Sequence, residues 1–348
     1  MTEKGTPLHL IINHLVHLAT ALTNDHSQPN LNALADKLKN IDAMALSLKY
    51  FGYELAATLA KSLPHNTDGK VQHVGLKSKA STQADMESAW ASYWCGQLKV
   101  PLVFHRKLWE YAYVLQTLYD HGMLQEGKRG LGFGCGQEPL PSYLAKAGVK
   151  VTITDLAPED SRDLGWLETK QHTDTLDAAF YDNLVDRPTF LQNATLRYVD
   201  MNAIPADLTN YDFCWSICSL EHLGSIKQGL DFIENALETL RPGGVAVHTT
   251  EFNFMNDAAT IDNWPTVLFQ KRHFLEIAER LRAAGHQVAE FDFSVGNKPL
   301  DKFIDIPPWV HDMSGDMATA WDSTVAHLKL SIDGFASTCF GLTVTKKA

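Results

Sequence analysis

The stretch KRGLGFGCGQEPL, residues 128–140, decides how this chain is expected to fold. A short apolar segment runs into glycines at positions 130, 132, 134 and 136, and a helix-compatible segment follows over residues 140–147. A second apolar segment over residues 149–154 ends at Asp155. Glycines let the backbone approach a ligand closely, and a carboxylate at a strand tip can accept two hydrogen bonds from a ribose diol. The stretch therefore predicts a nucleotide-type cofactor on a parallel sheet.

The spacing of the glycines excludes the commonest dinucleotide site. That fingerprint needs Gly-x-Gly-x-x-Gly. Counted from Gly132 its last position is Gln137, and counted from Gly134 it is Pro139. No Lys-Ser or Lys-Thr pair follows for a phosphate-binding loop. The pattern is instead Gly-x-Gly-x-Gly.

In this motif the chain resembles the class I S-adenosylmethionine-dependent methyltransferases, whose first motif is usually acidic-x-Gly-x-Gly-x-Gly. Aligned on Gly134 and Gly136, the sequence has Gly132 at the acidic place and Glu138 at the third glycine. The variant Gly-Phe-Gly-x-Gly-x-Glu-Pro-Leu is similar to that of a bacterial small-molecule subgroup.

Three later segments follow in the order typical of that family. Residues 196–202 read as a strand that ends in Asp200-Met201, and residues 211–223 as a strand that runs into Leu-Glu-His. Residues 237–244 match a helix end and a tight turn before a fifth strand at 245–250. Residues 104–110 resemble the helix that precedes the first strand. The resemblance covers the chain from about residue 106 onward and leaves the first hundred residues unexplained.

The resemblance implies S-adenosyl-L-methionine as the cofactor. It places the methionine moiety at the glycines, the ribose at Asp155, and the adenine between the Asp200 carboxylate and the next side chain. The complete set of predicted cofactor-binding residues is Gly132, Phe133, Gly134, Gly136, Glu138, Asp155, Leu156, Asp200, Met201, Ser216 and Cys218.

Composition limits the partners. The chain has 348 residues, 45% of them hydrophobic, a formal net charge of −11 and a mean hydropathy of −0.17. An acidic surface repels nucleic acids and anionic membranes, so neither is an expected partner. The five cysteines do not form a disulfide pattern, and no signal peptide or membrane span is recognisable, which together predict a cytoplasmic protein.

The expected architecture is an α/β three-layer Rossmann-like core, with a mostly parallel sheet and an antiparallel last strand. We expect a helical region over residues 1–100, able to form a homodimer contact, and a methyltransferase domain over 101–348 with insertions near 157–193 and 294–334. The insertions carry Trp166, Trp309 and Trp321, which could stack on a flat acceptor or simply pack.

His222 is the predicted general base, because it follows the fourth strand on the rim where open α/β sheets bind ligands. Glu251 is the second catalytic candidate, and Asn253 lies beside it. No metal site is predicted, since Glu221, His222 and Glu251 lack a recognised ligand spacing. The predicted function is methyl transfer to a small molecule, at a hydroxyl of a sugar or secondary metabolite. The alternative is a non-methylating relative, either an aminopropyl transferase or a cofactor-binding regulatory protein.

Overall fold

The computed structural model describes residues 12, 13, 16, 23, 40–64, 69–158, 172–309, 315, 316 and 326–348. It divides the chain into two compact units, Met1–Phe51 and Gly52–Ala348. Helix α3 (Ile41–Ala60) begins in the first unit and continues into the second. Most of the first 39 residues of the helical region expected over residues 1–100 lie outside the described residues, as do Trp166 and Trp321.

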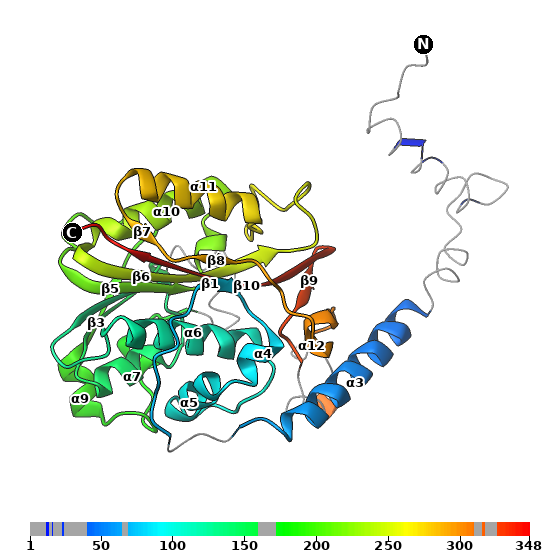
Figure 1. The fold of residues 1–348 in the computed structure, drawn as a ribbon, viewed down its shortest axis with the longest axis horizontal. Coiled ribbons are helices and arrows are strands. Elements are labelled where there is room, and N and C mark those ends of the chain that lie inside the picture. The colour runs from blue at the N-terminus through cyan, green and yellow to red at the C-terminus, as the bar shows by residue number, and fades with distance from the viewer. Residues whose placement is uncertain are drawn as a thin grey trace, which may run out of the picture. The chain divides into compact units, whose positions relative to one another are not determined.

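A mixed sheet forms the centre of the second unit (Figure 1). Five strands run parallel in the spatial order β4-β3-β2-β5-β6. The last strand, β10, lies antiparallel to β6, from Ser337 opposite Asn253 to Thr345 opposite Val245. The predicted sheet, mostly parallel with an antiparallel last strand, is therefore confirmed. The strands are β2 (Arg129–Phe133), β3 (Lys150–Asp155), β4 (Ala194–Tyr198), β5 (Tyr211–Ile217), β6 (Leu240–Asn253) and β10 (Phe335–Thr345).

Four short strands complete the sheet beside β10. The strands β1 (Ser78–Ala80), β7 (Gln287–Val288) and β9 (Leu330–Ile332) pair with β10, and β8 (Phe291–Asp292) pairs with β1. Residues 287–293 form two short strands, because the chain leaves β10 after Ala289 and reaches β1 at Glu290. The Ala289 amide donates to the Thr343 carbonyl, and the Ser78 amide donates to the Glu290 carbonyl.

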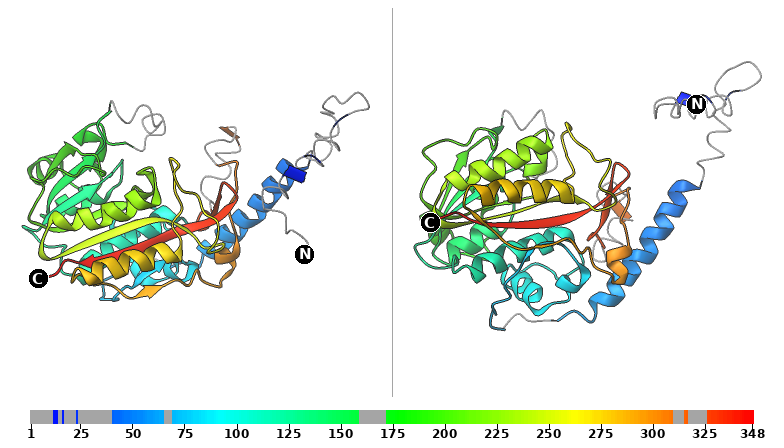
Figure 2. Two further views of the ribbon diagram at one scale, coloured as in Figure 1. Left: turned by 90° about the horizontal axis from the view of Figure 1, so that it is seen from above. Right: turned by 45° about the horizontal axis from the view of Figure 1, so that its top comes forward.

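Helices cover both faces of the sheet, and the two further views in Figure 2 show the same layers. On one face lie α4 (Gln83–Met86), α5 (Ala89–Gln97), α6 (Arg106–Asp120), α7 (Leu140–Lys146) and α9 (Arg187–Asn193). On the other lie α10 (Ile226–Glu238) and α11 (Lys271–Ala283). The remaining short helices are η1 (Leu176–Ala179), η2 (Leu220–His222) and α12 (Pro299–Lys302).

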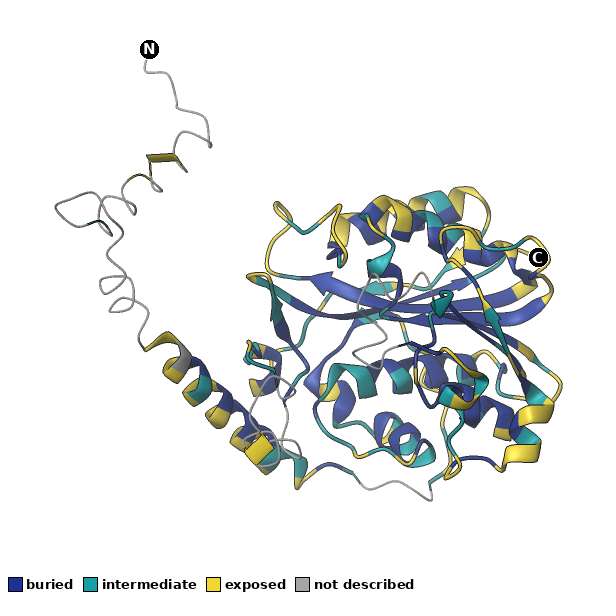
Figure 3. Cartoon of the chain, turned by 180° about the vertical axis from the view of Figure 1, so that it is seen from behind, coloured by how far each residue is buried: buried dark blue, intermediate teal, exposed yellow. Residues whose placement is uncertain are grey.

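The amphipathic pattern of α10 shows why these helices form and where they pack. Ile226, Leu230, Ile233 and Leu237 recur at steps of three and four and are buried, which places one apolar stripe against the sheet. The Ser225 hydroxyl caps the helix by accepting from the Gln228 amide at 3.2 Å. Figure 3 shows the result, with buried strands between helices whose outer faces are exposed. Among the described residues, no helix has the length and apolarity needed to cross a bilayer.

Candidate active site at the carboxyl ends of the strands

The glycine loop after β2 turns sharply enough to require glycine. Gly134 and Gly136 have φ angles of 56° and 50°, a region that side chains other than glycine rarely adopt. A Cβ at Gly134 would also lie 2.8 Å from the Cβ of Ser219. The Ser219 hydroxyl donates to the Gly134 carbonyl at 3.0 Å, so the loop is held against the end of β5.

Asp155 lies at the tip of β3, as predicted, and its carboxylate binds the surrounding backbone. Oδ2 accepts from the amides of Gly136 at 3.0 Å and Thr173 at 2.9 Å, and Oδ1 accepts from its neighbour Leu156 at 2.8 Å. The pKa of Asp155 is raised because burial outweighs the lowering effect of these amides and of His172. The predicted ribose-binding carboxylate is thus already bonded by three N–H groups.

The loop after β4 places its two predicted residues differently. Met201 is buried, and its sulfur would lie 3.4 Å from a Cβ at Gly134, so it borders the glycine loop. Asp200 is exposed and accepts from the Asn202 amide at 2.8 Å. Met201 therefore borders the glycine loop, whereas the Asp200 carboxylate faces solvent.

The side chains of Phe133 and Ser216 lie on the face of the sheet that is covered by α10. The ring of Phe133 packs edge-on against Phe232 with a centroid distance of 5.2 Å. The hydroxyl of Ser216 lies 2.8 Å from His248 Nδ1. These side chains are core residues, and only their backbone atoms are placed toward the ends of the strands.

Glu138 is buried at the start of α7. Its Oε1 accepts from the indole N–H of Trp215 at 2.6 Å. Burial raises its pKa to about 8, against the opposing effects of Trp215 and Lys107. Gly132 lies next to the same indole, because a Cβ there would be 2.4 Å from Trp215 Cζ2.

A buried charged cluster lies between α6 and the ends of β5, β6 and β10. Arg106 forms an ion pair with Glu251, whose other oxygen accepts from the Ser337 hydroxyl at 2.6 Å. Lys107 lies 3.2 Å from Glu110, which also accepts from the Cys218 thiol at 2.9 Å. Burial would raise the pKa of Glu110, but Lys107 and then Arg106 hold it below its usual value.

Cys218, one of the predicted cofactor-binding residues, also contacts the buried charged cluster. It has a φ of 46°, which is uncommon for a side-chain-bearing residue, and its amide donates to the Thr249 carbonyl at 3.0 Å. Its sulfur lies 3.7 Å from that of Cys339. The strained backbone turns the thiol toward α6 rather than into the sheet.

The cluster contains groups that could in principle hold a metal ion. Ligand atoms of Cys218, Glu221 and Glu251 all lie within 4.8 Å of one another, as do those of Glu110, Cys218 and Cys339. The guanidinium of Arg106 stands among them, because Nη1 is 3.6 Å from Cys218 Sγ and pairs with Glu251. In the described chain an arginine therefore supplies the positive charge that a metal would supply.

His222 is half-buried on the rim, and its ring faces the loop that precedes α11. Nδ1 lies 3.0 Å from the Pro265 carbonyl and 3.2 Å from the Thr266 hydroxyl. A carbonyl can only accept, so Nδ1 carries the proton and Nε2 is the basic nitrogen of the neutral ring. Asn253 is buried close by and donates to the Ala259 carbonyl at 3.2 Å, which fixes the same loop.

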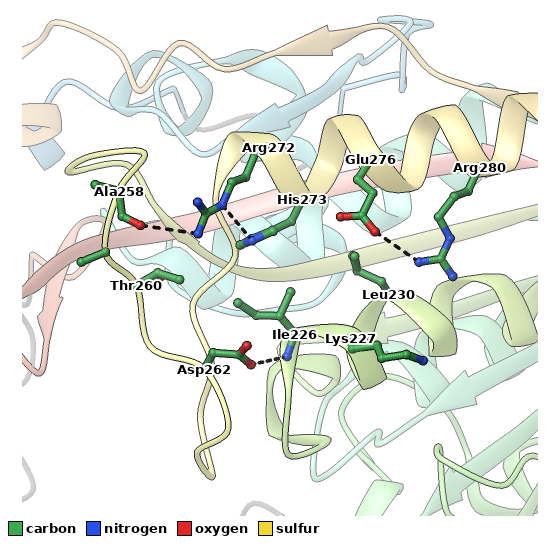
Figure 4. A pocket seen from close by; sticks show the side chains of 11 residues that line it. Ile226, Lys227, Leu230, Ala258, Thr260, Asp262, Arg272, His273, Glu276 and Arg280 are labelled. Atoms are coloured by element: carbon green, nitrogen blue, oxygen red, sulfur yellow. Dashed lines mark hydrogen bonds and ion pairs between the residues drawn. The ribbon is translucent and has the colours of Figure 1, made fainter.

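A cavity of about 480 Å³ lies elsewhere, between the start of α10, α11 and the loop at 258–262 (Figure 4). Its cations already have partners. Arg280 binds Asp231, Glu234 and Glu276, and Arg272 donates to His273 and to backbone carbonyls. The cavity contains none of the predicted site residues, and the neutralised charges give it no evident ligand.

Several residues at the carboxyl ends of the strands were not predicted from the sequence to belong to the site. Thr173, Trp215 and Ser219 contact the glycine loop or its carboxylate, and Arg106 and Glu110 contact Glu251 and Cys218. The only sequence signal was the resemblance of residues 104–110 to a family helix. Trp309, for which stacking on an acceptor and simple packing were both open, packs edge-on against His327 at 5.2 Å.

Comparison with known proteins identifies the family. A model of the methyltransferase domain matches residues 108–295, more than half of the chain. No curated protein matches the sequence. Solved structures with a similar fold include the (4+2)-cyclase SpnF, at 16% identity and a TM-score of 0.45, covering 78% of this chain and 100% of that one.

Two methyltransferase structures show the same level of similarity. A putative sarcosine dimethylglycine methyltransferase from Galdieria sulphuraria has 16% identity and a TM-score of 0.42, covering 69% of this chain and 88% of that one. Magnesium protoporphyrin IX methyltransferase from Synechocystis has 12% identity and a TM-score of 0.41, covering 80% and 90%. The match to the family model establishes the family, whereas these distant structural similarities do not. The chain belongs to the methyltransferase domain family and is an S-adenosylmethionine-dependent methyltransferase.

Proposed function

We propose that this enzyme methylates a hydroxyl group of a small molecule, such as a sugar or a secondary metabolite, at the rim formed by residues 218–222 and Glu251. The observation that carries the proposal is the orientation of His222. Its Nδ1 proton is held by the Pro265 carbonyl, so the basic nitrogen is Nε2. A hydroxyl acceptor needs such a base at neutral pH, whereas a carboxylate acceptor does not.

The cofactor is proposed to bind along the glycine loop, Asp155, Asp200 and Met201. Bound there, S-adenosylmethionine supplies an electrophilic methyl group. Three of the four acceptor positions of Asp155 are used by backbone amides. We therefore assign it one hydrogen bond to a ribose hydroxyl, at Oδ1, in place of the two that the sequence suggested. Met201 would cover the adenine, whose amino group would face Asp200.

On the acceptor side, His222 would take the hydroxyl proton at Nε2. Glu251 is engaged by Arg106 and Ser337, so we assign it a binding role instead of a proton-accepting one. Glu251 would hold Arg106 in place, and the guanidinium group, whose side chain is 20% exposed, would donate to the acceptor's other hydroxyls. The enzyme then contributes mainly orientation and one proton transfer, which suits an in-line displacement.

One observation favours a second candidate, transfer to a cationic amine. Aminopropyl transfer requires paired carboxylates around an ammonium group, and the sequence suggested only Glu221. The fold brings Glu251 near it, with oxygen atoms of the two within 4.8 Å. The two functions differ in the group transferred and in its donor, so S-adenosylmethionine labelled in the methyl group and decarboxylated S-adenosylmethionine labelled in its aminopropyl chain distinguish them.

The test is a transfer assay with methyl-labelled cofactor and fractionated small metabolites, with and without a chelator. We expect label in a hydroxyl-bearing product. We expect His222→Ala to lose roughly 10²–10⁴ in turnover while cofactor affinity is unchanged. His286→Ala is the matched control, because His286 contacts the Lys347 amide, away from this rim. Unchanged turnover in His222→Ala would reject the base, and label transferred only from the aminopropyl chain of the decarboxylated cofactor would favour the second candidate.

A further inference from the structure

Glu138 is a buried carboxyl group in the cofactor-binding motif without a cationic partner. Only 5% of it is exposed, and its one hydrogen bond to another element comes from Trp215. Among the described residues, no lysine, arginine or histidine lies within ion-pair distance of it. A buried charge without a partner is costly, so such a group either keeps its proton or awaits a cation.

The position of Glu138 is coupled to the glycine at 132. A side chain at 132 would collide with Trp215 and with Cys135, at 2.4 and 2.3 Å. The indole that fills this space is the same group that donates to Glu138. The two departures from the family motif, a lost acid at 132 and a gained acid at 138, are therefore connected through one tryptophan.

We propose that Glu138 accepts a charge-assisted hydrogen bond from the α-ammonium group of the cofactor's methionine moiety. The inference rests on the cofactor position proposed above, which places that moiety at the glycine loop. The ammonium is chosen over the sulfonium because it has N–H donors, and a buried carboxylate needs a hydrogen bond as well as a charge. Gly132 leaves room for Trp215, which holds the Glu138 carboxyl in place for this contact.

Proton release follows from this contact. The pKa of Glu138 is about 8, raised first by burial and further by Glu110, so the group is mostly protonated at pH 7 without cofactor. Lys107, Glu110 and Tyr111 of α6, with Cys135 and Tyr181, are the other titratable groups that act on it or feel its charge. An ammonium group would stabilise the carboxylate, and the Glu138 proton would pass to solvent as the cofactor binds.

The experiment is calorimetric titration of the full chain with S-adenosylhomocysteine and with S-adenosylmethionine, in buffers of different ionisation enthalpy. Between pH 6 and 7.5 we expect Kd to fall by up to about tenfold per pH unit, with close to one proton released. Glu138→Gln should weaken both ligands by about tenfold or more at pH 7.5 and should abolish proton release. Glu126→Gln, at an exposed glutamate, should change neither.

Two further ligands and one variant make the outcome decisive. Methylthioadenosine lacks the ammonium group, so its Kd should change neither with pH nor in Glu138→Gln. Trp215→Phe keeps the carboxyl but removes its donor, and should move the pH dependence upward. Equal binding and equal proton release in Glu138→Gln would overturn the proposal, as would a loss confined to S-adenosylmethionine, which indicates the sulfonium. If the wild-type protein bound none of the three ligands, the proposed cofactor position itself would be rejected.

Discussion

Asp155 joins three separate segments before any ligand is considered. Its two oxygens hold the amide of the glycine loop, the amide of Thr173 and the amide that follows β3. We expect Asp155→Asn to lose about 1–3 kcal/mol of folding stability without cofactor, because the amide nitrogen of Asn would face an N–H group that needs an acceptor. Denaturant unfolding of the ligand-free protein measures this loss.

Asp200→Asn is the control for this prediction. Asp200 is exposed, so its substitution should change stability by less than about 0.5 kcal/mol. If Asp155→Asn is as stable as the wild type, its carboxylate serves ligand binding alone and the three hydrogen bonds contribute nothing measurable. The pair therefore separates a structural role from a binding role at two positions that the sequence treats alike.

The sequence identified residues of the site whose positions follow from local order along the chain. A carboxylate at the end of a parallel strand lies where the carboxyl ends of the strands meet, whatever the rest of the fold does. The position of Asp155 could therefore be predicted. Thr173 and Trp215 could not be predicted in this way, because their contacts join segments that are distant in the sequence. Ser216 was predicted to bind the cofactor, but the alternation of side chains along β5 directs its hydroxyl toward His248.

At the scale of elements, Asp85 ties the end of β1 and helix α4 to helix α6. It is buried, and it accepts from Lys79 Nζ at 2.7 Å and from the indole N–H of Trp109 at 2.9 Å. We expect Asp85→Ala to lose about 2–4 kcal/mol of folding stability, because the lysine and the indole both lose a buried acceptor. Urea unfolding is the measurement.

An exposed ion pair provides the comparison. Asp207 pairs with Arg197 at 2.7 Å, and both side chains are largely in water. Asp207→Ala should therefore shift the urea unfolding midpoint much less than Asp85→Ala does. Equal losses in the two variants would mean that burial does not set the value of these carboxylates, contrary to the account given for Asp85.

The same region shows how far element boundaries follow from sequence. Within the helical region expected over residues 1–100, the structure has two separate helices, α4 and α5, between residues 83 and 97. The break occurs because Thr82 and Ser88 each cap a helix, accepting from the amides of Asp85 and Ala91 at 3.2 Å. Apolar periodicity continues across such a break, so it cannot reveal it. The strand β1 was missed for another reason, since its three residues are defined only by pairing with β10.

At the scale of the whole molecule, the buried carboxyl of Glu138 predicts a pH dependence of stability. Its pKa rises from 4.5 to about 8 on folding, so the folded protein retains a proton that the unfolded chain has lost. Stability from this group is complete below pH 4.5 and is lost as pH rises through 8. The buried His248, whose pKa falls to about 3, acts oppositely but only below about pH 6.5.

The useful window is therefore pH 7 to 8. There we expect Glu138 to lower the unfolding free energy of the cofactor-free protein by about 1 kcal/mol. The buried Lys329, whose pKa falls to about 8, partly offsets this loss. Glu138→Gln should remove the Glu138 contribution, and saturating cofactor should do the same in the wild type. Denaturant titrations of both proteins at several pH values provide the measurement, and identical pH profiles for the wild type and Glu138→Gln would contradict the raised pKa.

The place of β10 in the sheet has a consequence for biosynthesis. The strand lies between β6 and β1, is buried along most of its length, and is the last strand in the sequence. During translation the parallel strands emerge first and can assemble, but β6 then presents an open edge to other nascent chains. A ribosome that stalls before residue 335 leaves that edge uncovered. Emergence of residues 335–345 is the event that closes the sheet, so chaperone dependence should be concentrated in the interval before it.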